Sequence, residues 1–360
     1  MTAPDRARTE LITRPEGPGR RRAPLSRRGL FAAGGALGLG ALLTACSDDG
    51  DSGGSDGSGD GKSTGAWSFR DDRGETAKAK ATPKRIVAYV ASAAALHDFG
   101  IDCAAIYGPS QLKNGKSAPQ AGSLDAGRIP SLGTTGQFSI EKYAALRPEL
   151  LVANVNVGKH LWQLPEQSEE KILGFAPSVG IRTSDVSLVT AVQRYADLAQ
   201  SLGADMKAKA VTDAKARFEQ AAERLRKAAK ANGGLRVLAV AAQPDALSAA
   251  VPDKLPDLRY YKELGVQLIV PKQPGPPGYW EKHSWENADA YRPDILFYDQ
   301  RSNNMPLDEV ARSKPTWNDL PAVKAGQVVP WNNEAQFTHA GYAPLMEKLA
   351  DALEKGKKVG

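Results

Sequence analysis

Cysteine and histidine are scarce in this 360-residue chain, which has two cysteines and four histidines. The cysteines are Cys46 and Cys103, and the histidines stand at positions 97, 160, 283 and 339. They form no His-x-x-x-His pair and no cysteine cluster, and the chain from residue 67 onwards has no aspartate-rich calcium loop. We therefore expect no site for a bare metal ion.

Excess positive charge is missing from most of the chain, although the whole sequence carries a net charge of +6. Residues 1–28 contain eight arginines and three acidic residues. Without them, 39 Lys and Arg (47 minus 8) face 38 Asp and Glu (41 minus 3), a net charge of +1. The folded part thus lacks the electrostatic footprint of nucleic-acid binding, and we expect no nucleic-acid partner.

The N-terminus resembles a bacterial export signal. Arg27 and Arg28 lie in the sequence SRRGLF, which resembles the twin-arginine motif, and the uncharged stretch 29–45 follows. That stretch ends in Leu-Thr-Ala-Cys46, which resembles the lipobox, whose cysteine is acylated and becomes the first residue after cleavage. We expect residues 1–45 to be a cleaved signal peptide and Cys46 to be a lipid anchor on the extracytoplasmic face of the cell membrane. Export by the general secretion route stays open.

A retained membrane helix is the alternative for residues 29–45, but seventeen residues is short for a helix that spans a bilayer. Residues 46–66 hold the predicted lipidated cysteine and a Ser, Gly and Asp tract that cannot bury apolar surface, so we expect a flexible linker. Once Cys46 carries lipid, only Cys103 remains, and no intrachain disulfide can form.

A long helical segment divides the rest of the chain. Apolar residues recur at spacings of three and four through Val211, Phe218 and Leu225, which predicts an amphipathic helix over residues 204–232. A repeat flanks it: Ser, Glu, Arg, Pro, an acid and Leu recur in register in segments 139–152 and 284–297. Each copy predicts a short helix that begins at Glu141 or Glu286, ends at Arg-Pro and leads into a buried strand. The pattern predicts two similar α/β lobes, residues 67–203 and 233–360, joined by one helix.

Several segments together resemble a known family. The segment PKRIVAYV (83–90), the two Glu-to-strand blocks with the central helix between them, and LPAVKAGQVVPW (320–331) follow one another along the chain. Together they resemble the substrate-binding lipoproteins of ABC importers for ferric siderophores, haem and cobalamin. The similarity covers about residues 67–355. It implies an α/β fold of two Rossmann-like lobes joined by a single long α-helix, with a ligand cleft between the lobes at the strand ends. It also implies a monomeric binding protein, not an enzyme.

The resemblance gives Glu141 and Glu286 a role. In the family, one exposed glutamate on each lobe docks on arginines of the membrane permease. Two carboxylates at a fixed separation suit recognition by a symmetric permease dimer. Without the resemblance, each glutamate would be read as a helix N-terminal acid that favours the helix dipole.

The cleft should collect side chains that follow the predicted strands. Aromatic rings can wall a bulky ligand, and arginines can donate to its oxygen atoms. The predicted ligand-binding residues are Tyr107, Asn154, His160, Trp162, Arg182, Tyr279, Trp280, Arg301 and Trp331.

The predicted ligand is a ferric siderophore, with the hydroxamate type favoured, delivered to an ABC permease dimer. Iron would then enter only as the chelate, and no cofactor is expected. Haem, with Tyr107 or His160 as an axial ligand, and cobalamin are the alternatives within the class.

Two alternatives come from other classes. One is a secreted glycosidase-like enzyme that uses Glu141 and Glu286, although equivalent positions in two lobes suit symmetric docking better than an acid and a base. Outside the predicted linker, the sequence also has no Gly-x-Ser-x-Gly motif, no Gly-x-Gly-x-x-Gly after a strand and no Walker loop. The other alternative is a binding protein that serves a sensor.

Overall fold

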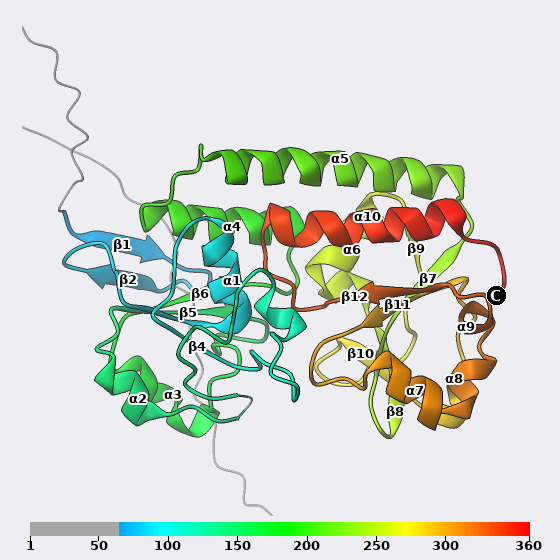
Figure 1. Ribbon diagram of the computed structural model, residues 1–360, viewed down its shortest axis with the longest axis horizontal. Helices are drawn as coiled ribbons and strands as arrows, with labels where there is room; N and C mark the ends of the chain where they lie inside the picture. Colours follow the sequence, from blue (N-terminus) through cyan, green and yellow to red (C-terminus); the bar gives the residue numbers. More distant parts are fainter. Residues whose placement is uncertain (1–64, 135) are drawn as a thin grey trace, which may run out of the picture. The chain divides into compact units, whose positions relative to one another are not determined.

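Two larger β-sheets, each covered by helices, organise the chain, and a third sheet has only two strands (Figure 1). The computed structural model describes residues 65–134 and 136–360. The predicted signal peptide, Cys46 and nearly all of the predicted linker lie outside the described residues. Within the described ranges, no helix is both long and apolar enough to cross a bilayer.

The N-terminal lobe is built on a four-stranded parallel sheet with strand order β4-β3-β5-β6. A short antiparallel hairpin, β1 with β2, precedes it. The strands are β1 (Trp67–Arg70), β2 (Thr76–Ala79), β3 (Ile86–Tyr89), β4 (Ala105–Tyr107), β5 (Leu150–Val155) and β6 (Ser178–Arg182). The helices are α1 (Val90–Asp98), η1 (Pro119–Ala121), α2 (Ile140–Ala145), η2 (Glu166–Ser168), α3 (Glu169–Leu173) and α4 (Leu188–Ser201).

The C-terminal lobe has a six-stranded mixed sheet with order β10-β8-β7-β11-β12, and β9 pairs with β7. The strands are β7 (Arg236–Ala242), β8 (Ala246–Ala250), β9 (Gln267–Leu268), β10 (Trp280–Ser284), β11 (Ile295–Asp299) and β12 (Val328–Trp331). The helices are η3 (Pro252–Lys254), α6 (Pro256–Glu263), η4 (Trp285–Asn287), α7 (Leu307–Ser313), α8 (Pro315–Asp319), α9 (Pro321–Lys324) and α10 (His339–Lys355). Strands β8 and β10 are antiparallel, so the two lobes are less alike than the repeat indicates.

The sequence repeat has a structural role in both lobes. The backbone N–H of Arg85, just before β3, donates to the Glu149 carboxylate at 3.0 Å, and that of Arg236, at the start of β7, donates to Asp294 at 2.8 Å. The side chain of each arginine also donates to the backbone oxygen of the repeated arginine, Arg147 or Arg292. The repeated Arg-Pro-acid segment therefore ties together the starting ends of two neighbouring strands in each sheet.

The two copies differ at the glutamate. Glu141 lies in the first turn of α2, where the Ser139 hydroxyl accepts from the backbone N–H of Lys142 and caps the helix. The equivalent Ser284 makes no side-chain cap hydrogen bond, and only the three-residue 3₁₀ helix η4 forms around Glu286. The second predicted short helix is therefore only one 3₁₀ turn, because the cap that satisfies the first turn is missing.

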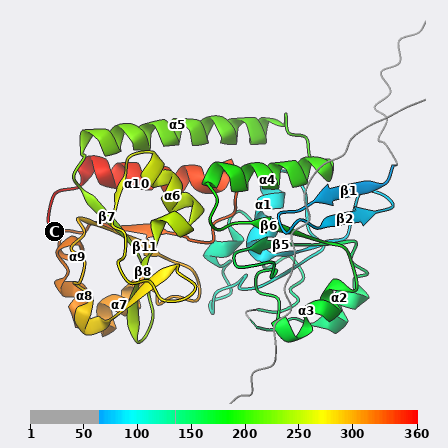
Figure 2. The ribbon, with the colours of Figure 1, turned by 180° about the vertical axis from the view of Figure 1, so that it is seen from behind.

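The linking helix is α5 (Lys209–Ala231), which is shorter at its start than the predicted 204–232. Asp205 accepts a hydrogen bond from the backbone N–H of Lys207 and holds that segment in a turn. In Figures 1 and 2, α5 runs alongside α10. Its buried face includes Phe218 and Leu225 and belongs to an apolar cluster that continues into both lobes.

Ion pairs also join α5 to α10. The Arg217 side chain donates twice to Glu347, at 2.7 and 2.6 Å, and Arg224 donates to Glu354 and Asp351. These side chains are partly exposed, so each pair stabilises the contact by about 1 kcal/mol or less. The burial of apolar side chains is the larger contribution to this contact.

Two neighbouring residues of α5 separate these contributions. Leu225 is fully buried, and Leu225→Ala should lower the free energy of unfolding by about 2–5 kcal/mol, because it leaves a cavity against α10. Arg224→Ala is the matched control and should cost about 1 kcal/mol or less. Urea unfolding followed by circular dichroism measures both. An equal decrease in the free energy of unfolding in the two variants would contradict the larger contribution of apolar burial to this contact.

Candidate functional site

A hollow of about 210 Å³ lies between the two lobes, and its lining comes from both. The N-terminal lobe contributes Asn154, Asn156, Val157, Trp162 and Thr183. The C-terminal lobe contributes Leu255, Pro277, Tyr279, Trp280, Arg301, Asn333, Glu334 and Phe337. Much of this lining lies at or just beyond the carboxyl ends of β5, β6, β11 and β12. This is the place where open α/β sheets bind ligands, and we call this hollow the cleft.

Five of the nine predicted ligand-binding residues line the cleft: Asn154, Trp162, Tyr279, Trp280 and Arg301. The indole N–H of Trp162 is buried and has no hydrogen-bond partner among the described residues. Asn154 is almost fully buried and accepts hydrogen bonds from Ser92 and Tyr195. Asn154 therefore joins the cleft floor to the hydrogen-bond network of the N-terminal lobe.

The other four predicted residues do not line the cleft. Tyr107 and Trp331 are each 1% exposed; the Tyr107 hydroxyl donates to the backbone oxygen of Trp162, and the Trp331 indole donates to Asp257. Arg182 donates to the backbone oxygen of Gly158. Tyr107 and Trp331 support residues of the cleft from behind.

His160 is the fourth of these residues and lies in a separate open hollow beside β2, with Lys159 and Glu169. Its Nδ1 lies 2.6 Å from the Glu169 carboxylate, whose other oxygen accepts from the backbone N–H of Leu161. This contact positions the loop after β5, and His160 does not face the space between the lobes.

The segment after β12 also lines the cleft, although its residues were not predicted to do so. Asn333, Glu334 and Phe337 line the cleft, and Asn156 and Thr183 do so from the N-terminal lobe. The signal was present, since Asn333 and Glu334 follow the predicted last strand as other cleft residues follow theirs. Asn333 lies two positions beyond Trp331, the last residue that was predicted to bind ligand.

The charged residues of the cleft form one buried cluster of Asp299, Arg301 and Glu334, which we call the carboxylate–arginine cluster. Arg301 Nε donates to Asp299 at 2.7 Å, and Arg301 Nη1 donates to Glu334 at 2.7 Å. The Arg301 guanidinium also lies 5.9 Å from the ring centroid of Trp280. Burial raises the pKa of Asp299 above its usual value, although the neighbouring Arg301 opposes this shift. The arginine is therefore already paired before any ligand arrives.

Contacts between the lobes narrow the cleft. The Tyr89 hydroxyl of the N-terminal lobe donates to Glu334, and the Tyr279 hydroxyl of the C-terminal lobe donates to the backbone oxygen of Asn156 at 2.8 Å. Lys254 and Asp185 form an ion pair between the lobes at 2.7 Å. The cleft volume is below the roughly 300–1,000 Å³ of ordinary ligand pockets, so a bulky ligand must displace some of these contacts.

A second buried carboxylate lies behind the cleft. Asp257 is 1% exposed and accepts hydrogen bonds from the Trp331 indole at 2.6 Å and from the backbone N–H of Leu258 at 2.9 Å. Burial raises the pKa of Asp257 to about 7, against the lowering effect of these hydrogen bonds. Trp331 packs against Trp280, with ring centroids 6.2 Å apart, so Asp257 supports one wall of the cleft.

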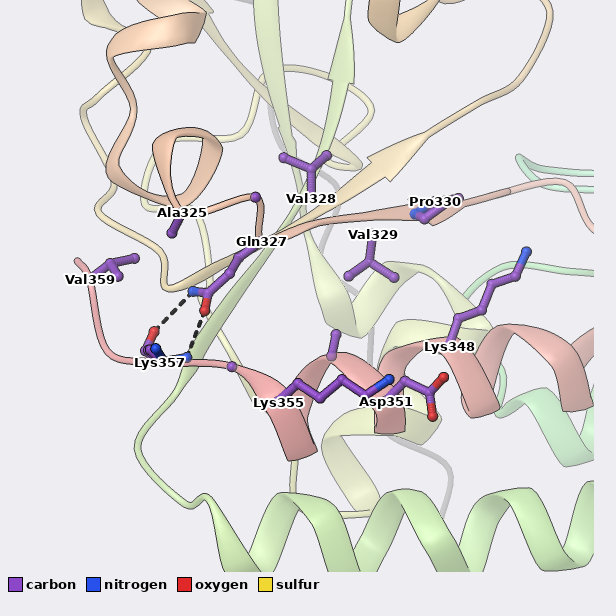
Figure 3. Close-up of a pocket in the computed structure, with 13 residues that line it drawn as sticks. Ala325, Gln327, Val328, Val329, Pro330, Lys348, Asp351, Lys355, Lys357 and Val359 are labelled. Atoms are coloured by element: carbon purple, nitrogen blue, oxygen red, sulfur yellow. Dashed lines mark hydrogen bonds between the residues drawn. The ribbon is translucent and has the colours of Figure 1, made fainter.

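A larger hollow of about 710 Å³ lies on the surface of the C-terminal lobe, between β12 and the end of α10 (Figure 3). Hydrogen bonds between the Gln327 side chain and the backbone of Lys357 close one end of it. It has no aromatic lining and contains none of the predicted site residues. The cleft between the lobes is therefore the candidate site.

No arrangement for a bare metal ion appears in the part of the chain that the structure describes, where no three His, Cys, Asp or Glu side chains are grouped suitably. Glu141 and Glu286 are both exposed and lie outside the cleft. In Figures 1 and 2, α2, which carries Glu141, lies on the side of its lobe away from α5. The same holds for α8, which adjoins Glu286.

Comparisons with known proteins agree with this geometry. The family described as "Periplasmic binding protein" matches residues 86–335. The crystal structure of DesE, a ferric-siderophore receptor protein from Streptomyces coelicolor, is 43% identical, with a TM-score of 0.79 over 82% of this chain and 100% of that one. The Fe(3+)-citrate-binding protein YfmC of Bacillus subtilis is 22% identical over 83% of this chain and 89% of its own length. The petrobactin-binding protein YclQ of Bacillus subtilis is 18% identical with a TM-score of 0.59, over 81% of this chain and 99% of that one, and shows the fold alone.

The position of Asp257 predicts a pH effect on the cleft wall. Because burial raises its folded pKa to about 7, Asp257 favours the folded state most at low pH, and this contribution is lost as the pH rises from about 4 towards 7. Its ionisation should also change the emission of Trp331, with a midpoint near pH 7.

The measurement is tryptophan fluorescence between pH 5.5 and 8.5, and Asp257→Asn is the test variant. The transition near pH 7 should disappear in this variant. An unchanged transition in Asp257→Asn would assign it to another group.

Proposed function

Because the chain belongs to the family of periplasmic binding proteins, we propose that it captures a ferric siderophore outside the cytoplasmic membrane and delivers it to an ABC permease. The similarity to the ferric-siderophore receptor of Streptomyces coelicolor carries this proposal, since it combines 43% identity with full coverage of that protein. The cleft between the lobes gives the proposal a physical site.

Periplasmic binding proteins serve transport on the extracytoplasmic side, and they are not enzymes. The glycosidase alternative with Glu141 and Glu286 is therefore wrong. Iron enters as part of the chelate, and the protein contacts the outside of that chelate. A binding protein that serves a sensor would use the same cleft.

The charges of the cleft support a hydroxamate-type ligand. A ferric tris-catecholate carries several negative charges and would need unpaired cations, whereas a ferric trihydroxamate is neutral at its metal centre. Arg301 is the one cation among the described residues that line the cleft, and it is already paired with Asp299 and Glu334. Trp162, Tyr279 and Trp280 offer apolar walls to the organic part of the chelate.

Haem and cobalamin are the second candidates, but the structure gives haem little support. The two side chains considered for an axial bond are Tyr107, which is buried and donates to Trp162, and His160, which lies outside the cleft beside Glu169. Neither side chain lines the space between the lobes.

Docking on the permease would use Glu141 and Glu286. Both carboxylates are exposed, and each belongs to the duplicated block that ties its lobe's strands together. Their separation is therefore set by rigid parts of the two lobes. In this proposal the protein acts as a monomer, and a lipid on Cys46, followed by the linker 46–66, keeps it at the membrane.

Ligand titration tests the binding function. The purified protein should lose tryptophan fluorescence on addition of a ferric trihydroxamate, because Trp162 and Trp280 line the cleft. Weak or no response is expected with a ferric tris-catecholate, haem, cobalamin or ferric chloride. Saturable binding of cobalamin or haem with no response to any iron chelate would contradict the proposal.

Charge reversal tests the docking function. Glu141→Arg with Glu286→Arg should abolish uptake of the radiolabelled chelate in cells and leave its affinity for the purified protein unchanged, because the change lies outside the cleft. Glu219→Arg, an exposed change on α5, is the matched control and should import normally. Normal import by the double variant would remove the docking role.

A further inference from the structure

The cleft holds more negative than positive charge. Arg301 and Glu334 are the charged residues that line it in the described part of the chain, and Asp299 lies directly behind Arg301. Arg301 is 9% exposed and Glu334 8% exposed, so solvent screens this cluster weakly. One guanidinium therefore faces two carboxylates.

Each oxygen of the two carboxylates accepts a hydrogen bond. One oxygen of Glu334 accepts from Arg301 and the other from the Tyr89 hydroxyl. One oxygen of Asp299 accepts from Arg301 Nε, and the other accepts from the backbone N–H of Arg301 at 3.2 Å. A carboxyl group whose two oxygens both accept in this way has the pattern of an anion.

Neighbouring cations are occupied elsewhere. Lys254 pairs with Asp185 at 2.7 Å, and Arg182 donates to the backbone oxygen of Gly158 at 2.9 Å. Lys159 pairs with Glu75 at 3.0 Å, outside the cleft. The carboxylate–arginine cluster thus keeps an excess of one negative charge among the described residues.

A purely structural role of the carboxylate–arginine cluster does not require this excess negative charge. Asp299 alone would pair with Arg301, and a second buried anion adds a desolvation cost that needs compensation. In this structure the second oxygen of Glu334 is compensated only by Tyr89, which belongs to the opposite lobe. Separation of the lobes would remove that donor and leave the oxygen facing the ligand space.

We propose that Glu334 makes the cleft selective for ferric trihydroxamates that bear a positively charged group, over neutral or anionic ones of similar size. This inference rests on the proposed function and adds the charge of the ligand and the residue that recognises it. A ligand ammonium would replace the Tyr89 hydroxyl on Glu334, while Arg301 would stay paired with Asp299. The preference is electrostatic and requires no change in the apolar walls of the cleft.

The test compares two probes that differ in one charge. Ferrioxamine B is a linear ferric trihydroxamate with a terminal ammonium group, and its N-acetylated derivative is neutral. The wild-type protein should bind the ammonium form roughly tenfold more tightly, as one partly screened charge pair would give. In Glu334→Gln the ratio of the two affinities should fall to about one, mainly through weaker binding of the ammonium form.

Tyr89→Phe is the control variant, because it removes the hydroxyl but keeps the charge of Glu334, and it should retain the preference. Thermal unfolding checks that all variants are folded. Equal affinities of the wild-type protein for both probes would overturn the charge selectivity and leave the binding function intact. A preference that persists in Glu334→Gln would overturn the role of Glu334. Failure of both probes to bind the wild-type protein would instead count against the proposed function.

Discussion

The packing of α5 on α10 is the constraint on which the rest of the structure depends. One face of α5 is buried in an apolar cluster that continues through both lobes, and ion pairs with α10 lie along its edge. A helix held along its length by side chains cannot bend freely as a peptide linker can. The two sheets therefore keep a defined relation, and the space between their carboxyl ends becomes a binding site of limited width.

The duplicated block contains both structural residues and exposed residues. Its Arg-Pro-acid part ties neighbouring strands at their starting ends, through Glu149 in one lobe and Asp294 in the other. Its glutamates, Glu141 and Glu286, are exposed, and they do not tie strands together as Glu149 and Asp294 do. The repeat thus has two parts. The acid after proline is structural, and the two glutamates are surface carboxylates that are available to a partner.

The cleft combines aromatic walls with a buried ionic cluster. Rings such as Tyr279 and Trp280 provide contact area for a bulky chelate, and such contacts discriminate weakly among ligands of similar size. Buried charge discriminates more strongly, because an unpaired ion in a desolvated site is costly. Arg301 alone would favour anionic chelates, but it is paired with two carboxylates, Asp299 and Glu334, so the cluster has no excess positive charge.

The sequence by itself determined the two lobes, the long helix, most strands and five of the residues that line the cleft, because apolar periodicity and strand-end position are local signals. Only the tertiary structure decided that β8 and β10 run antiparallel and that η4 is a single 3₁₀ turn. It also decided that Tyr107 and Trp331 lie behind the cleft while Glu334 lies in it. These features depend on which strand pairs with which and on contacts across the lobes, such as that of Tyr89 with Glu334, whose partners are 245 residues apart. No local pattern encodes a contact at that separation, because its free energy arises only when both lobes are folded and held together.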